Sequence, residues 1–163
     1  MNYHYYIYSK NNLSSKAAGE FTELLSRQGR IIGDIKLKWK RCNNIVIAYH
    51  KNKPVGIGAI KKATKSVFLS DKADAQDLDL IIDFELGYLY THEENRRKGI
   101  SRTIINKLLD ENRGRNLMAT TEINNGAMRT ILEDNNFVMK GKEWQSSIDE
   151  QFLCLYVKVG TQS

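Results

Sequence analysis

The chain has 163 residues, with 25 lysines and arginines against 19 aspartates and glutamates, which gives a formal net charge of +6 with histidine neutral. Apolar residues make up 41% and charged residues 27% of the chain, a balance too apolar for a disordered chain and ordinary for a soluble globule. We therefore expect residues 1–163 to form a single domain with its own core. No apolar run approaches the roughly 20 residues of a membrane helix, and Met1–Lys10 lacks the pattern of a secretory signal, so we expect no membrane association.

The cysteines and histidines predict a cytoplasmic protein without a bound metal. Cys42 and Cys154 do not have the spacing of metal ligands, and they indicate reduced thiols. His4, His50 and His92 are the only histidines, and no two of them have the spacing of a zinc-binding pair.

The first part of the chain predicts a strand, a helix and a β-hairpin. Aromatic and β-branched residues favour strands, serine favours a helix N-cap, and glycine favours a left-handed helix end. Gly56 and Gly58 leave one face of the second hairpin strand without side chains, so another element can pack closely there. The predicted elements are a strand at Tyr3–Tyr8, a helix from Ser14 or Ser15 to Gly29, a short helix within Ile31–Arg41, and strands at Ile45–Tyr49 and Val55–Ile60.

The second part predicts a central strand followed by helices and strands in alternation. Residues 62–79 are polar and mixed, which favours a surface connection, whereas Leu80–Tyr90 is nearly apolar and predicts a strand covered on both faces. The further elements are a helix from Gly99 to Gly114, a strand at Leu117–Thr121, a helix from Asn124 or Asn125 to Asn136, and strands at Phe137–Lys140 and Phe152–Lys158. This order predicts a mixed α/β (α+β) fold with a mostly antiparallel sheet.

Three consecutive cations and a glycine stand between the central strand and the helix that follows it. A helix N-terminus offers unpaired backbone N–H groups and the positive end of the helix dipole. Gly99 allows a ligand close to the backbone, and Arg96, Arg97 and Lys98 add positive charge. The pattern predicts an anion site suited to phosphate or pyrophosphate. A solvated turn with a flexible glycine is the alternative interpretation.

These residues also resemble a known signature. Arg96-Arg-Lys-Gly-Ile-Ser101 is similar to the Arg/Gln-x-x-Gly-x-Gly/Ala motif of the GNAT superfamily of acyl-CoA-dependent N-acyltransferases, with Ser101 in place of the final Gly or Ala. Phe84–Thr91 resembles the fourth strand of that family, and Asn125–Phe137 resembles its Asn-x-x-Ala-x-x-Leu-Tyr-Glu-Lys-x-Gly-Phe segment. The resemblance implies a central, mostly antiparallel sheet that is flanked by helices and splayed between the fourth and fifth strands.

The resemblance further implies acetyl-CoA as co-substrate and an amine as acceptor. The pyrophosphate would lie on the backbone N–H groups of Arg97–Ser101 and Arg102, and the pantetheine arm would pair with the backbone of Leu89–Thr91. A backbone N–H near Leu89 or Tyr90 would polarise the thioester carbonyl. The implied cofactor-binding residues are Leu89, Tyr90, Thr91, Arg96, Arg97, Lys98, Gly99, Ile100, Ser101, Arg102 and Asn125.

Two catalytic residues are expected: Glu85, which the resemblance implies, and Tyr90, which can substitute for a tyrosine that this chain lacks. Glu85 precedes Gly99 by fourteen residues, an offset at which some acetyltransferases of the superfamily place a general-base glutamate. An ordinary carboxylate paired with a cation is the alternative. The family usually has a tyrosine as general acid where this chain has Leu132. Tyr88 or Tyr90 can substitute for it, although aromatic residues on a buried strand more often belong to the core.

The sequence thus predicts an N-acetyltransferase that moves an acetyl group from acetyl-CoA to a primary amine by direct attack. One alternative is a basic nucleic-acid-binding module, or an acetyltransferase of aminoacylated RNA, because Trp39 lies among the cations of Lys36–Arg41. A further alternative is a non-catalytic acyl-CoA-binding regulator. The protein is expected to be a monomer or a homodimer, and an edge strand such as Phe152–Val157 can pair two subunits.

Overall fold

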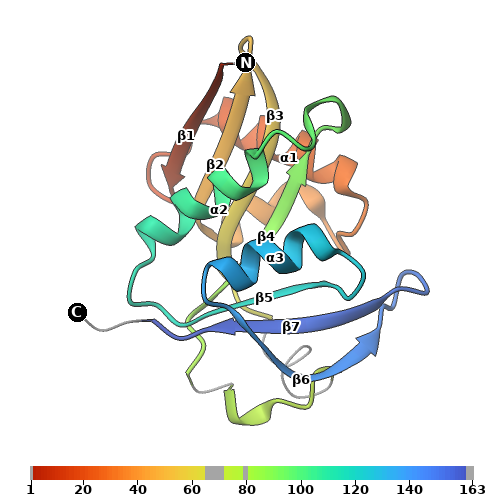
Figure 1. Cartoon of the computed structure of the whole chain (residues 1–163). Helices are drawn as coiled ribbons and strands as arrows, with labels where there is room; N and C mark the ends of the chain where they lie inside the picture. Colours follow the sequence, from red (N-terminus) through yellow and green to blue (C-terminus); the bar gives the residue numbers. More distant parts are fainter. Residues whose placement is uncertain (1, 65–71, 79–80, 161–163) are drawn as a thin grey trace. The chain divides into compact units, whose positions relative to one another are not determined.

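The computed structural model describes residues 2–64, 72–78 and 81–160 (Figure 1). The elements, in chain order, are β1 (Tyr3–Ser9), α1 (Ser15–Gln28), η1 (Ile35–Arg41), β2 (Cys42–His50), β3 (Lys53–Lys62), η3 (Gln76–Leu78), β4 (Phe84–Thr91), η4 (Glu93–Asn95), α2 (Ile100–Glu111), β5 (Leu117–Glu122), α3 (Gly126–Asp134), β6 (Val138–Gln145) and β7 (Phe152–Lys158). Three are helices of the α type, and the η elements are 3₁₀ helices. Within these ranges, no helix has both the length and the apolar character that crossing a membrane requires.

The described strands form one sheet in the order β1-β2-β3-β4-β5-β7-β6. The pairings β1–β2, β2–β3, β5–β7 and β6–β7 are antiparallel, and β4–β5 is parallel. The predicted mixed α/β fold with a mostly antiparallel sheet is therefore confirmed. The chain divides into two compact units, the first formed by residues 1–61 and 87–112 and the second by residues 62–86 and 113–163.

In the first unit, α1 and α2 cover opposite faces of the strands (Figure 1). The Ser14 hydroxyl accepts a hydrogen bond from the Ala17 N–H at 3.1 Å, and Gly29 ends α1 with φ of 75°, as the sequence predicts. The apolar stripe of α1 packs against residues of β2, β3 and β4. The buried members of this core cluster are Ala17, Phe21, Leu24, Leu25, Cys42, Ile45, Ile47, Ile57, Ala59 and Tyr88.

The two glycines of β3 make room for α2 on the other face. A Cβ atom on Gly56 would lie 2.9 Å from Ile100, and one on Gly58 would lie 2.6 Å from Ile104 and 2.7 Å from Leu89. Any larger residue would force these side chains apart. The expected close approach at these glycines is confirmed, and it brings α2 down onto the β4 residue Leu89.

In the second unit, α3 begins at the predicted cap and is joined to β7 by the hydrogen bonds of Arg129 and Glu133 with Tyr156. The Asn125 side chain accepts a hydrogen bond from the Met128 N–H at 3.1 Å, and Asn136 takes a positive φ of 67° after the helix. The prediction of a surface connection over residues 62–79 is wrong for Ala73 and Ala75, which are buried. These small residues let the chain lie against Gly141, where a Cβ would collide with the Ala73 carbonyl.

Three predicted boundaries are corrected. The central strand starts at Phe84 because Asn116 holds the residues before it in a turn, donating to the Ile81 carbonyl and accepting from Asp83, each at 2.8 Å; Leu80 lies outside the described residues. Helix α2 ends at Glu111, where the Asn112 side chain caps the Leu108 carbonyl. Strand β6 extends to Gln145, past Gly141 at a positive φ of 67° and a shift in register between Lys140 and Trp144.

The expected edge strand Phe152–Val157 is also corrected. β7 lies between β5 and β6, so its backbone pairs on both sides. Among the described strands the edges of the sheet are β1 and β6. β6 carries lysines and an irregular register, features that discourage pairing with another chain.

Candidate functional site

Strand β4 contains an irregularity at Tyr88. Its φ of 53° is left-handed, which is costly for a bulky residue and persists only where the surroundings fix it. The Tyr88 ring packs edge-on against Phe21, with centroids 6.0 Å apart, and the Lys61 ammonium lies 4.6 Å from the ring centroid. These contacts hold the irregularity, which changes the direction of the backbone just before Leu89.

After Tyr88, successive backbone N–H groups of β4 point to opposite sides of the strand. The His92 N–H donates to the Val55 carbonyl of β3 at 2.8 Å. Because neighbouring residues of a strand direct their N–H groups to opposite sides, the N–H groups of Leu89 and Thr91 point away from β3. The Leu89 carbonyl accepts a hydrogen bond from the Gln28 side chain at 2.7 Å. Leu89 and Thr91 therefore offer donors along the strand side that does not pair with β3.

Helix α2 begins with backbone N–H groups that precede its first helical hydrogen bond. The Thr103 N–H donates to the Gly99 carbonyl at 3.1 Å, so the N–H groups of Ile100 and Ser101 lie before that bond. No side chain in the described ranges caps this end. Arg97 and Gly99 have φ values of 61° and 75°, and left-handed residues in a turn are typical of concave anion sites. A Cβ on Gly99 would meet no heavy atom within 4 Å, so the backbone is open to a ligand there.

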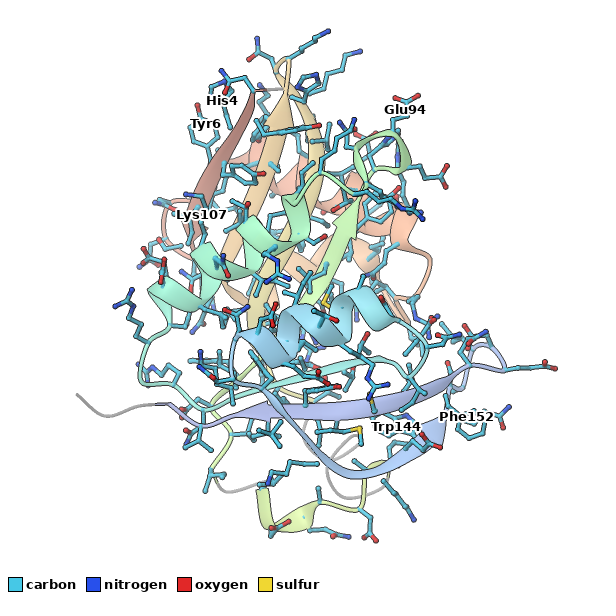
Figure 2. The ribbon with its side chains drawn as sticks, in the orientation of Figure 1. His4, Tyr6, Glu94, Lys107, Trp144 and Phe152 are labelled. Carbon is cyan, nitrogen blue, oxygen red and sulfur yellow. The ribbon has the colours of Figure 1, made fainter. Side chains whose placement is uncertain are left out.

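The three cations of the turn have different surroundings. The Arg96 Nε donates to the Thr91 carbonyl at 3.1 Å, and the Lys98 ammonium donates to the Glu94 carbonyl at 2.8 Å, in the loop after β4 where Figure 2 labels Glu94. Arg97 is exposed. None of Arg96, Arg97 and Lys98 forms an ion pair with a described residue. Their charge is thus available to an anion at the start of α2.

Ser101 replaces the small residue of the family motif and has a role of its own. Its hydroxyl lies 3.0 Å from the Thr91 hydroxyl. This hydrogen bond joins the end of β4 to the first turn of α2, so strand and helix N-terminus hold a fixed spacing. The pair was not predicted from the sequence, although two hydroxyl residues that flank the turn Arg96–Gly99, hereafter the cation turn, are a signal for it. Tyr90 packs partly buried against the core cluster of the first unit, with the Arg96 guanidinium 6.0 Å from its ring.

The first unit thus brings together the expected site residues from Leu89 to Arg102, while Glu85 and Asn125 belong to the second unit. Glu85 is 2% exposed and stands opposite Met118 in the parallel β4–β5 pairing, which covers only two residues of β4. Asn125 uses its side-chain oxygen as the N-cap of α3.

One polar cluster of the second unit is not evident from the sequence. The Tyr156 hydroxyl donates to Glu133 at 2.8 Å and accepts from the Arg129 Nε at 2.9 Å. Burial raises the pKa of Tyr156, so the phenol keeps its proton. Tyr156 is fully buried, and we interpret its hydrogen bonds as a link between β7 and α3.

Leu132 of α3 stands at the position of the family tyrosine, and it is also buried.

Comparisons with known proteins agree with the fold described above. A search of curated proteins found no match. Among solved structures, an acyl-CoA N-acyltransferase from Pseudomonas aeruginosa is similar, with a TM-score of 0.72 at 7% identity over 97% of this chain and 100% of that one. The ribosomal-protein-S18-alanine N-acetyltransferase from Escherichia coli has a TM-score of 0.67 at 12% identity, covering 98% and 97%. The structure of yncA from Salmonella typhimurium with its cofactor acetyl-CoA has a TM-score of 0.67 at 14% identity, covering 100% and 96%.

At these identities the solved structures establish the fold alone. The sequence itself matches a family model over residues 11–137, from the start of α1 through the cation turn to the end of α3. That range is more than half of the chain, and it contains the strand, turn and helix of the candidate anion site. The chain belongs to the acetyltransferase (GNAT) family.

Proposed function

We propose that the protein is an N-acetyltransferase that transfers the acetyl group of acetyl-CoA to a primary amine, and that the whole chain works as one catalytic domain. The observation that carries the proposal is the N-terminus of α2 at Gly99, which no described side chain caps, beside the cations Arg96–Lys98, which form no ion pair with a described residue. This donor set fits a diphosphate, because backbone N–H groups and the helix dipole favour negative charge at this point.

The side of β4 that faces away from β3 supports the binding of the acyl arm, which is the pantetheine of acetyl-CoA with its acetyl group. Leu89 and Thr91 present N–H groups at the spacing of an exposed strand edge, so an extended amide-containing chain can pair there. Of the two backbone donors suggested by the family resemblance, Leu89 is favoured over Tyr90. The N–H group of Tyr90 points to the side of β3, because it alternates with that of Leu89.

Acetyl-CoA supplies a thioester carbonyl that an amine can attack. In the transfer the amine nitrogen bonds to the acetyl carbon, the carbon–sulfur bond breaks with its electron pair on sulfur, and the nitrogen loses one proton. The properties of the two cysteines favour direct attack of the amine on the thioester over transfer of the acetyl group through a cysteine. Burial raises the pKa of the Cys42 thiol to about 12, and burial likewise raises that of Cys154, so neither provides a thiolate nucleophile.

The roles of Glu85 as general base and of Asn125 at the pantetheine or acetyl end remain proposals from the family resemblance. Tyr90 as general acid is a proposal of a different kind, because it would substitute for the family tyrosine that Leu132 replaces in this chain. CoA thiolate is a fair leaving group, so transfer does not require a dedicated acid.

The nucleic-acid alternative has weaker support. Trp39 is partly buried against the core cluster of the first unit, and the Lys40 ammonium lies 5.8 Å from its ring centroid. A ring held in this way offers little surface for stacking on bases.

Release of free thiol tests the proposed function. We expect the protein, mixed with acetyl-CoA and a panel of small amines, amino-terminal peptides and lysine peptides, to release CoA thiol only when an acceptor is present. A calorimetric titration with acetyl-CoA accompanies the assay. Binding without thiol release on any acceptor would indicate the non-catalytic regulator, and absence of binding at millimolar ligand would contradict both interpretations.

A further inference from the structure

The segment of residues 30–41, hereafter the basic segment, connects α1 to β2 in the first unit. It contains five cations and one acid, Asp34. The Asp34 carboxylate accepts a hydrogen bond from the Lys36 backbone N–H at 3.0 Å and caps η1. Lys36 and Lys40 are exposed, and neither forms an ion pair with any residue in the described ranges. The basic segment therefore presents positive charge that its own unit does not neutralise.

The apolar residues of the basic segment fall into two groups. Ile31, Ile35 and Trp39 recur at every fourth position and pack against the core cluster of the first unit. Ile32 and Leu37 are exposed instead, at 67% and 49%. Because Leu37 directly follows the exposed Lys36, the segment presents aliphatic and cationic side chains to solvent within a few residues. Such a surface fits a partner with an apolar side chain and negative charge.

The basic segment begins next to the strand that we propose holds the acyl arm. Gln28, the last residue of α1, donates its side-chain hydrogen bond to the Leu89 carbonyl of β4. Tyr90 packs against the same core cluster as Ile35 and Trp39. The start of the basic segment is thus joined by a hydrogen bond to β4, at the strand residues that we propose hold the acyl arm.

We propose that the basic segment binds the acceptor, and that the acceptor is an acidic peptide carrying an apolar side chain near its reactive amine. This inference rests on the proposed acetyltransferase function. The exposed side chains Ile32 and Leu37 are aliphatic and the ring of Trp39 faces inward, which favours a peptide over a nucleic acid. Lys36 and Lys40 attract the acidic residues of the peptide and fix its orientation.

Three peptides of equal length test the proposal. All have the same free amino terminus and one leucine, contain no lysine, and differ only in carrying glutamate, glutamine or arginine at the remaining positions. We expect kcat/KM for thiol release to be about tenfold higher for the glutamate peptide than for the glutamine peptide, and lowest for the arginine peptide. The difference should shrink as salt rises, because exposed charges are screened.

A pair of double variants locates the effect. In Lys36→Glu/Lys40→Glu we expect kcat/KM for the glutamate peptide to fall about tenfold, with less than about a twofold change for the glutamine peptide. Lys10→Glu/Lys53→Glu changes the net charge equally at exposed positions outside the site and should leave the peptide order intact. Acetyl-CoA affinity should be the same in both variants and the wild type.

The possible results separate this inference from the function on which it rests. Equal kcat/KM for the glutamate and glutamine peptides, or an equal loss in both double variants, overturns the inference while leaving acetyl transfer in place. Acetylation of small amines or aminoacylated RNA but of no peptide also overturns it. A wild-type protein that does not bind acetyl-CoA overturns the proposed function as well.

Discussion

Replacing Gly99 by glutamate is expected to raise the Kd for acetyl-CoA about 100-fold while the protein stays folded. A carboxylate about 5 Å from the diphosphate opposes it by about 3 kcal/mol at an effective dielectric constant near 20, which corresponds to that loss of affinity. No heavy atom lies within 4 Å of a Cβ at this position, so the fold has room for the start of a side chain there. Calorimetric titration measures the Kd, and thermal unfolding followed by circular dichroism checks the fold.

Gly99→Gln is the matched control for this substitution. Both side chains have nearly the same shape and impose the same cost of about 1 kcal/mol at the left-handed φ of 75°. Glutamine lacks the charge, so we expect its Kd to rise by no more than about tenfold, through crowding at the backbone. Similar affinities for the two variants would show that charge at Gly99 is irrelevant and that the diphosphate binds elsewhere.

The second large effect is expected for Glu85→Gln, if the buried carboxylate acts as the general base. Loss of a positioned base typically costs about 100-fold or more in kcat, while the Kd for acetyl-CoA should not change. The lost activity should partly return as pH rises, because the acceptor amine then loses its proton to solvent without help from the enzyme. A pH profile of kcat for the variant and the wild type measures this recovery, which a purely structural role would not produce.

The control for Glu85→Gln is Glu94→Gln, the same change in the exposed loop after β4 that Figure 2 labels. Its kcat and pH profile should match those of the wild type. If Glu85→Gln retains more than about half of the wild-type kcat at neutral pH, no base is needed at this position. The proton would then leave to water or to another group.

The features that were predictable from the sequence are those that depend on neighbouring residues. Ser14 and Gly29 mark the ends of α1 because capping needs only local side-chain and backbone chemistry. The cation turn was recognisable for the same reason, since Arg97, Lys98 and Gly99 are consecutive and precede an amphipathic stripe. The absence of side chains at Gly56 and Gly58 likewise indicated a close packing partner.

The features that were not predictable join residues far apart in the sequence. The hydrogen bond from Gln28 to Leu89 spans 61 positions, and no local pattern at either residue indicates it. The left-handed Tyr88 depends on packing with Phe21 and Lys61. Because Tyr88 is a non-glycine residue inside an apolar run, the sequence predicts a regular strand there, and only the structure shows the irregular backbone.

The binding of the diphosphate at the start of α2 is tested most directly by the backbone amide resonances of the wild-type protein. We expect the amides of Arg97–Arg102 to shift on titration with CoA and to stay in place on titration with pantetheine, which has no diphosphate. If CoA saturates the protein and these amides do not move, the diphosphate does not bind at this helix N-terminus.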